Sequence, residues 1–483
     1  MSTRKAPLAA LAVAVIATDV MAVRLNPDGL GQALIYPSYT VQSSEGNNSW
    51  NTYLSVANHS RDVKALRVRF REGRNGRNVG NLNLYLSPND VWTGAIIPSD
   101  VSPTSVARII TTDSSCTYPA IPAAGETFTN VGYLGSLDDG LGVGLDRTRE
   151  GYVEIIEMAS FASYSSTGVA VTHANGVPKD CTVVANSNFD GTPDLQPPTG
   201  GLSGTLTLIN VNSGMDAGMN ALALEGLADK SFFRGPDSDY PGFNAAEILP
   251  VSTVRAGGKE YDLKWKNGVD AVSSVFMASE ILNEYVLDPA TASQTDWVIT
   301  FPTQPYASRS TPPFNGAGLY FDQRDIYDRE GNVQHASMGS TSFCVFQGLP
   351  CPPAWLDHAA SVVFPVGHAS EPSLLGSSRG TNLAAGMPPE FTSGWIRIRV
   401  QDSLPDFGRL RSEPGSTMTD LATGAVTTGR FELFGLPWTG FMVRTFRNGT
   451  LRCITNSGLQ TGCQGNYAGS FPHRYVRTIT QIP

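Results

Sequence analysis

The chain has 483 residues, of which 41% are hydrophobic and 16% charged, and its formal net charge is −9. The hydrophobic fraction argues against a disordered or collagen-like chain, and the negative charge argues against nucleic acid as a partner, because phosphate binding requires a basic surface. Glycine (49) and proline (32) are abundant, which indicates a folded, turn-rich protein of two or three domains at roughly 100–200 residues per domain.

Residues 1–22 have the features of a secretory signal peptide. Arg4 and Lys5 precede an apolar run over residues 7–17, and the small residues Val20 and Ala22 predict cleavage after Ala22. The run is shorter than the roughly 20 residues that span a bilayer. The sequence therefore predicts an exported protein without a transmembrane anchor, located in the periplasm, at the cell surface or outside the cell.

Alternation of apolar and polar residues predicts β-strands through most of the chain. The clearest segments are residues 66–71, 81–86, 205–208 and 396–401. In segment 66–71, arginines occupy every second position, so we expect one strand face on a core and the arginine face in water. Parallel α/β sheets would instead show continuous apolar runs.

Turn signals separate these segments. Asn-Gly and Asp-Gly pairs, which tolerate the positive φ of tight hairpins, begin at Asn75, Asn175, Asn267, Asn315, Asn448, Asp28, Asp139 and Asp190. One helix is expected over residues 278–287, with Ser279 as its cap. The predicted fold is all-β: two β-sandwich units, immunoglobulin-like or jelly-roll-like, with long loops and at most one or two short helices.

Residues 186–201 have a linker's composition, rich in Asn, Gly, Pro and Thr. They divide the mature chain into a predicted N-terminal β-sandwich over residues 23–185 and a C-terminal β-rich domain over residues 202–483.

Six cysteines follow the signal segment, and an even number in an exported protein favours disulfides. Six cysteines allow 15 connectivities. Nearest-neighbour spacing suggests the pairs Cys116–Cys181, Cys344–Cys351 and Cys453–Cys463. No C-x-x-C motif points to a metal instead.

Several segments of the chain resemble one group of proteins. Residues 31–41, 50–58 and 84–92, together with 146–157 and 296–303, are similar to uncharacterised exported bacterial β-rich surface proteins with an immunoglobulin-like N-terminal region. The resemblance spans most of the mature chain, but its motifs are loose. It implies an exported location and a β-rich fold, and it carries over no activity and no catalytic residues.

A weak calcium-site candidate lies in the linker-like segment. Asn186, Asn188 and Asp190 match the first half of an EF-hand loop, and Asp194 adds a fourth oxygen ligand. Pro197 stands where such a loop needs a bidentate glutamate, so a polar linker is the alternative. No other cofactor is expected.

Paired carboxylates offer the second chemistry to consider. Glu154 and Glu157 would face opposite sides of a regular strand, whereas Glu150 and Glu154 share a face, as do Asp322 and Asp328. Two carboxylates roughly 5–10 Å apart would suit glycoside hydrolysis. Pairing with neighbouring arginines is the alternative.

Hydrolase motifs are weak. The segment 376–380 matches G-x-S-x-G with Ser378 at the nucleophile position, but its flanking prolines predict a loop and not a strand-to-helix turn. A Ser-His-Asp set would have to be assembled in space from distant segments.

These patterns favour an exported cell-envelope or extracellular protein that is structural or adhesive, acting by surface binding or assembly and not by catalysis. Its partners would be further copies of itself, other envelope proteins or glycans. The alternative is a secreted carbohydrate-binding or glycoside-hydrolysing protein, which an exposed row of Trp or Tyr beside a groove would favour.

Overall fold

The computed structural model describes residues 21–45, 48–100, 102, 105–185, 194–236, 238–307, 311–314, 323–336, 359–368, 372–400, 402, 406–455 and 458–483. β-Strands dominate these residues, which confirms the all-β fold. Three short helices occur in the described ranges, one more than predicted: α1 (Ser166–Val171), α2 (Thr182–Ala185) and α3 (Gly268–Phe276).

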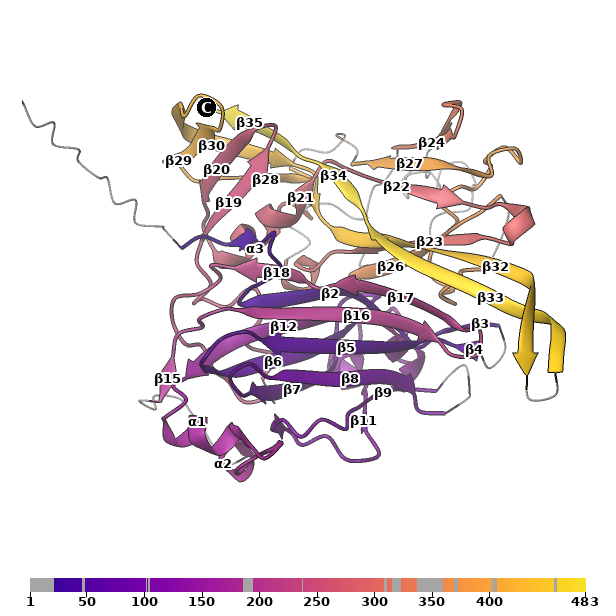
Figure 1. The fold of residues 1–483 in the computed structure, drawn as a ribbon. Coiled ribbons are helices and arrows are strands. Elements are labelled where there is room, and N and C mark those ends of the chain that lie inside the picture. The colour runs from indigo at the N-terminus through magenta and orange to yellow at the C-terminus, as the bar shows by residue number, and fades with distance from the viewer. Residues whose placement is uncertain are drawn as a thin grey trace, which may run out of the picture.

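Two antiparallel sheets form the N-terminal layers (Figure 1). The eight-stranded sheet contains, in spatial order, β1 (Arg24–Leu25), β18 (Leu222–Glu225), β2 (Ala33–Thr40), β12 (Glu150–Phe161), β6 (Val63–Glu72), β7 (Asn78–Leu86) and β10 (Thr117–Tyr118), with β15 (Leu195–Gln196) paired to β12. The six-stranded sheet contains β11 (Glu126–Thr127), β9 (Ala107–Ile110), β8 (Val91–Pro98), β5 (Asn51–Asn58), β16 (Leu202–Asn210) and β17 (Met215–Asn220). Apolar side chains from both sheets, such as Val68 and Leu206, meet in one core.

The segment 186–201 does not separate two sets of sheets, which corrects the expected boundary. Strand β16 pairs with β5 along Leu202–Asn210, and β18 pairs with β2. Two strands that follow the linker-like segment, β16 and β18, therefore belong to the N-terminal sheets. Each pairs with a strand from the first 58 residues of the chain.

A four-stranded sheet contains β26 (Ser361–Val366), β23 (Gln294–Thr300), β32 (Thr439–Thr455) and β33 (Gly458–Pro472). Two neighbouring strands of this sheet, β26 and β23, are almost entirely buried. Val298 and Phe441 face the N-terminal core, whereas Trp297, Ile299 and Met442 face a second core. Burial on both sides explains why three consecutive residues of β23, Trp297, Val298 and Ile299, are all apolar.

Asp296 is the buried carboxyl group of β23. Its Oδ2 atom accepts hydrogen bonds from Ser373 Oγ at 2.5 Å and from the Leu375 amide at 2.9 Å. Burial raises the pKa of Asp296 from 3.8 to about 6, although these hydrogen bonds oppose the shift.

This raised pKa predicts a specific pH dependence of stability. The folded state binds the proton more tightly than the unfolded state, so stability from Asp296 is fully present below pH 3.8 and is lost as the pH rises to about 6. The unfolding free energy of Asp296→Asn minus that of the wild type should therefore increase by about 3 kcal/mol over this interval. Denaturant titrations at several pH values measure it, and a difference that does not change with pH would refute the assignment.

Two further sheets cover the remaining faces. The five-stranded sheet contains β25 (Val333–Ala336), β24 (Gln323–Asp328), β27 (Ser393–Arg399), β22 (Glu280–Val286) and β34 (Arg474–Val476), and it shares the second core with the four-stranded sheet. The last sheet contains β19 (Val251–Ala256), β20 (Lys259–Lys264), β29 (Ser416–Asp420), β30 (Val426–Phe434) and β28 (Arg409–Arg411), with β35 (Thr478–Ile482) paired to β30. Two-stranded pairs complete the pattern: β3 (Ser43–Glu45) with β4 (Asn48–Ser49), β13 (His173–Ala174) with β14 (Val177–Pro178), and β21 (Met277–Ala278) with β31 (Leu436–Pro437).

The prediction of a helix over residues 278–287 is wrong. This segment forms β22, in which Ile281, Asn283 and Tyr285 are buried with a period of two. The helix lies just before it, as α3, and Asn267 caps it by accepting a hydrogen bond from the Asp270 amide at 2.9 Å. The Asn-Gly pair at Asn267 therefore begins a helix and not a hairpin.

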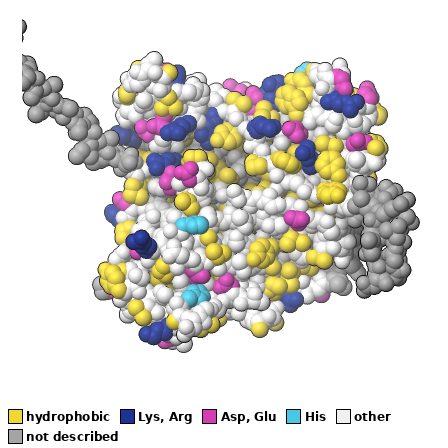
Figure 2. Space-filling view, viewed as in Figure 1, with side chains coloured by type: hydrophobic (Ala, Val, Ile, Leu, Met, Phe, Trp, Pro, Cys, Tyr) yellow, Lys and Arg dark blue, Asp and Glu magenta, His cyan; other side chains and the backbone are white. Residues whose placement is uncertain are grey.

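The surface carries few charges. In the view of Figure 2, acidic and basic side chains are scattered among uncharged and hydrophobic ones, without a large area of one sign. None of the helices in the described ranges has the length and apolar character needed to span a membrane.

Candidate functional site

The arginine face of β6 is buried, which corrects the expectation that it faces water. Arg67 and Arg69 are 0% and 1% exposed. Segments that follow β18 cover this face, since Arg67 donates to the Gly235 carbonyl at 2.7 Å and Arg69 donates to the Asp239 carbonyl at 2.7 Å. Backbone carbonyls thus solvate guanidinium groups that the alternation alone would have placed in solvent.

Glu154 is the centre of this buried network. Arg71 Nε donates to Glu154 Oε1 at 2.9 Å, and the Tyr306 hydroxyl donates to Glu154 Oε2 at 2.6 Å. Arg69 lies 3.8 Å from the same carboxylate. Burial alone would lower the pKa of Arg71, but the Glu154 carboxylate raises it above its usual value. The Glu154 carboxylate therefore forms ion pairs with both Arg69 and Arg71.

The other candidate carboxylates of β12 are also held in separate ion pairs. Glu157 accepts from Lys64 Nζ at 2.8 Å, and Glu150 lies 3.4 Å from Arg379. All three glutamates are buried. Each of these glutamates is therefore paired with an arginine or a lysine. Asp322 lies outside the described residues, and Asp328 instead binds the Asn332 side chain and amide.

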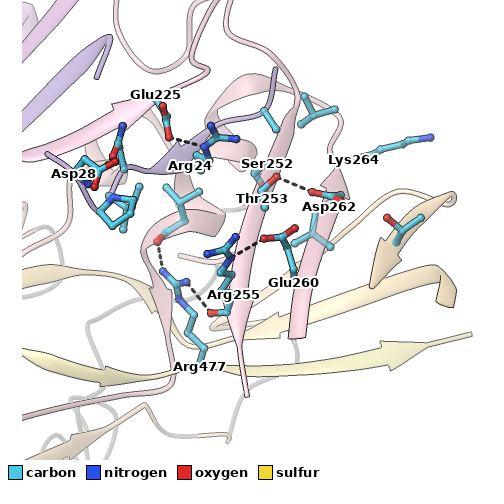
Figure 3. A pocket seen from close by; sticks show the side chains of 18 of the residues that line it. Arg24, Asp28, Glu225, Ser252, Thr253, Arg255, Glu260, Asp262, Lys264 and Arg477 are labelled. Carbon is cyan, nitrogen blue, oxygen red and sulfur yellow. Dashed lines mark hydrogen bonds and ion pairs between the residues drawn. The ribbon is translucent and has the colours of Figure 1, made fainter. Parts of the chain in front are cut away.

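A large cleft lies between the N-terminal strand and the β19–β20 hairpin (Figure 3). Its volume is about 1020 Å³. Two ion pairs lie within the cleft: Arg24 pairs with Glu225 at 2.5 Å, and Arg255 pairs with Glu260 at 2.6 Å. Asp28, Asp262 and Lys264 also line it, so the cleft presents polar groups of both signs and suits a neutral polar ligand better than an ion of one sign.

Arg477 lies at the inner wall of this cleft. Its guanidinium donates to the carbonyls of Val275, Met277 and Arg255, the last two at 3.2 Å (Figure 3). Burial lowers its pKa, and its charge stacks 4.8 Å from the centre of the Tyr475 ring. Arg477 therefore ties α3, β19 and the C-terminal strand together.

A small apolar cavity of about 130 Å³ adjoins the cleft, and the two share Leu25, Val275, Tyr475 and Arg477. His473 lines its far side. Burial lowers the pKa of His473 to about 3, so the ring is neutral: Nε2 donates to the Val298 carbonyl at 3.0 Å, and Nδ1 accepts from Asn283 at 3.1 Å. Together, the cleft and the adjoining apolar cavity could bind a polar molecule that ends in a small apolar group.

The calcium prediction is largely untested. Asn186, Asn188 and Asp190 lie outside the described residues. Asp194 accepts a hydrogen bond from Ser166 Oγ at 2.9 Å. Within the described ranges, no group of three or more His, Cys, Asp or Glu residues is arranged to hold a metal ion.

One predicted disulfide is present. Cys116 and Cys181 are bonded, and the bond closes a separation of 65 residues. Cys344 and Cys351 lie outside the described residues, as do the side chains of Cys453 and Cys463, so both of those pairs stay predictions. Ser378 lies in a bend between β26 and β27, as its flanking prolines predicted.

Comparison with known proteins gives no relative: no family model, no curated protein and no solved structure matches the chain.

Proposed function

We propose that this chain is an exported structural or adhesive protein of the cell envelope or exterior, which acts by binding or assembly at its surface. The signal-like N-terminus, the one observed disulfide and the commitment of the candidate carboxylates to ion pairs support this function. The suggested immunoglobulin-like character of the N-terminal region is part of the same proposal.

The observation that carries the proposal is the long β32–β33 hairpin. Its strands have 17 and 15 residues, which corresponds to roughly 50–60 Å of extended chain. Strand β32 pairs with β23 only through Thr445, and beyond this point its described residues pair only with β33. The yellow arm in Figure 1 therefore extends past the body of the protein.

Exposed aromatic side chains lie at the base of this hairpin. Tyr467 is 58% exposed and Phe471 is 41% exposed, and both lie on the same face of β33. Arg444 lies 4.5 Å from the centre of the Phe471 ring. Aromatic and arginine side chains are those enriched at the energetic centres of protein interfaces, so this hairpin base is suited to contact another protein or a further copy of the chain.

The double substitution Tyr467→Ser/Phe471→Ser tests this proposal. We expect the variant to weaken self-association or binding to isolated cell envelopes by at least about tenfold, because buried interface aromatics each contribute more than about 1 kcal/mol. Sedimentation velocity and binding to envelope preparations measure the two effects. Tyr164→Ser, at a tyrosine that is 85% exposed elsewhere on the surface, is the matched control and should change neither.

A wild-type protein that stays monomeric and binds no envelope would contradict the proposal. So would a double variant that behaves as the wild type does.

Glycan binding at the cleft of Figure 3 is the second candidate. Tyr475 is 53% exposed and lines both the cleft and its apolar extension, so a sugar ring could stack on it while the surrounding polar groups bind hydroxyls. A glycan array followed by calorimetry tests this candidate. Tyr475→Ala should weaken binding of any glycan found by at least about tenfold, whereas failure of the wild type to bind any glycan would remove the candidate.

A further inference from the structure

Three residues from distant segments meet near the Cys116–Cys181 disulfide. His173 Nδ1 lies 3.2 Å from Asp90 Oδ2, and His173 Nε2 lies 3.2 Å from Ser114 Oγ. The imidazole is thus placed between a carboxylate and a serine hydroxyl, each facing a different ring nitrogen. This is the order of contacts that activates a serine for nucleophilic attack.

Each of the three residues is held by its local backbone. Asp90 ends the turn between β7 and β8, where its carboxylate accepts from the Ser87 amide at 3.1 Å and the Val91 amide at 2.9 Å. His173 begins the β13–β14 hairpin, whose turn is formed by Asn175 and Gly176, both with positive φ.

The disulfide fixes the loop that carries the serine. Ser114 stands two residues before Cys116, and Cys181 follows the β13–β14 hairpin that carries His173. The covalent bond therefore joins the serine-bearing loop to the segment that presents the histidine. This bond restricts the relative movement of the two segments.

The oxygen atoms around His173 suit one tautomer of its ring. Ser87 Oγ accepts from the His173 amide at 3.0 Å and lies 2.6 Å from Nδ1. Asp90 Oδ2 lies 3.2 Å from the same nitrogen. In the tautomer that carries its proton on Nδ1, both oxygens accept from the ring, and Nε2 can accept the proton of Ser114.

The hydroxyl of Ser114 has a choice of two acceptors. Its oxygen lies 3.0 Å from the Gly176 carbonyl as well as 3.2 Å from His173 Nε2. Rotation about the Cβ–Oγ bond transfers the hydrogen bond from the carbonyl to the imidazole. Because Ser114 is exposed, an ester carried by a small molecule or by a large polymer can approach it from solvent.

We propose that Ser114, His173 and Asp90 form an acyl-transfer site that hydrolyses carboxylic esters reaching the protein from solvent. Ser114 Oγ bonds to the ester carbonyl carbon while its proton passes to His173 Nε2, and that proton then goes to the departing alcohol oxygen as the ester C–O bond breaks. Water attacks the acyl-serine in the same way, the acid is released, and Ser114 recovers its proton. This activity is independent of the proposed adhesive function.

Labelling of the intact, oxidised protein with a fluorophosphonate probe tests the site, with the labelled peptide identified by mass spectrometry. Ser203 is a matched internal control: its hydroxyl lies 2.8 Å from His59 Nε2, but no carboxylate in the described part of the chain forms an ion pair with His59. We expect Ser114 to react at least about 100-fold faster than Ser203, because Asp90 orients the His173 ring and stabilises its charge whereas His59 has no such carboxylate in the described residues.

Asp90→Asn and His173→Gln should each slow labelling of Ser114, and hydrolysis of p-nitrophenyl acetate, by about 100-fold or more. Ser114→Ala should remove the label while Ser203 keeps its slow reaction. The comparison of Ser114 with Ser203 within the wild type needs no variant to fold. Equal labelling of the two serines, or a Ser114 rate unchanged in folded Asp90→Asn protein, would overturn the proposal.

Discussion

Replacing Glu154 by glutamine is expected to lower the free energy of unfolding by about 3–5 kcal/mol, because the change leaves a buried arginine cluster without its carboxylate. Arg71 and Arg69 both lie within ion-pair distance of Glu154, and all three side chains are almost fully buried. Glutamine keeps the shape and an acceptor oxygen but removes the negative charge. Denaturant titration of the variant and the wild type measures the difference.

Glu260→Gln is the control for this effect. Glu260 pairs with Arg255, whose side chain is 72% exposed, so solvent already screens that interaction. Its loss should cost less than about 1 kcal/mol. A Glu154→Gln cost as small as that of Glu260→Gln would mean that the buried network does not hold the eight-stranded sheet to the segments that cover it.

Removing the Cys116–Cys181 bond is expected to cost about 4 kcal/mol of unfolding free energy, because the bond restricts the unfolded chain over 65 residues. The double variant Cys116→Ser/Cys181→Ser should show this loss in denaturant titration without a change in overall β content. Reduction of the wild type should reproduce the loss, and reduction of the double variant should add little. A double variant as stable as the oxidised wild type would contradict the expectation.

Local pattern was sufficient to predict the fold class. The period of two over residues 205–208 and 396–399 predicted half-buried strands, which the structure contains as parts of β16 and β27. The spacing of Cys116 and Cys181 predicted the observed bond. These features depend on neighbours in sequence or on simple chain proximity, which is why they can be read without a structure.

The wrong predictions concern residues whose burial or strand pairing depends on segments that are distant in sequence. Arg67 and Arg69 have the sequence pattern of surface residues, but in the folded chain they donate hydrogen bonds to the backbone carbonyls of residues 234, 235 and 239. Strand β22 carries apolar residues that also fit a helical spacing, and its pairing with β27 and β34 selects the strand. The linker-like composition of residues 186–201 predicted a domain boundary, whereas β16 pairs with β5 in the six-stranded N-terminal sheet.

The Ser114, His173 and Asp90 cluster shows the same dependence on tertiary structure. Its members are separated by 24 and 59 positions in sequence, and none of them lies in a recognisable motif. The Asn-Gly pair at Asn175 was the available signal, because it predicts the turn that presents His173.

Export of the chain is the central requirement of the proposed function, because a disulfide-bonded protein that acts at the cell surface must leave the cytosol. Mass spectrometry of native protein recovered from culture medium, envelope and cytosol tests this directly. We predict that the recovered chain begins at Val23, is found outside the cytosol and carries Cys116 linked to Cys181. A cytosolic chain that retains Met1 and has both thiols free would contradict the account.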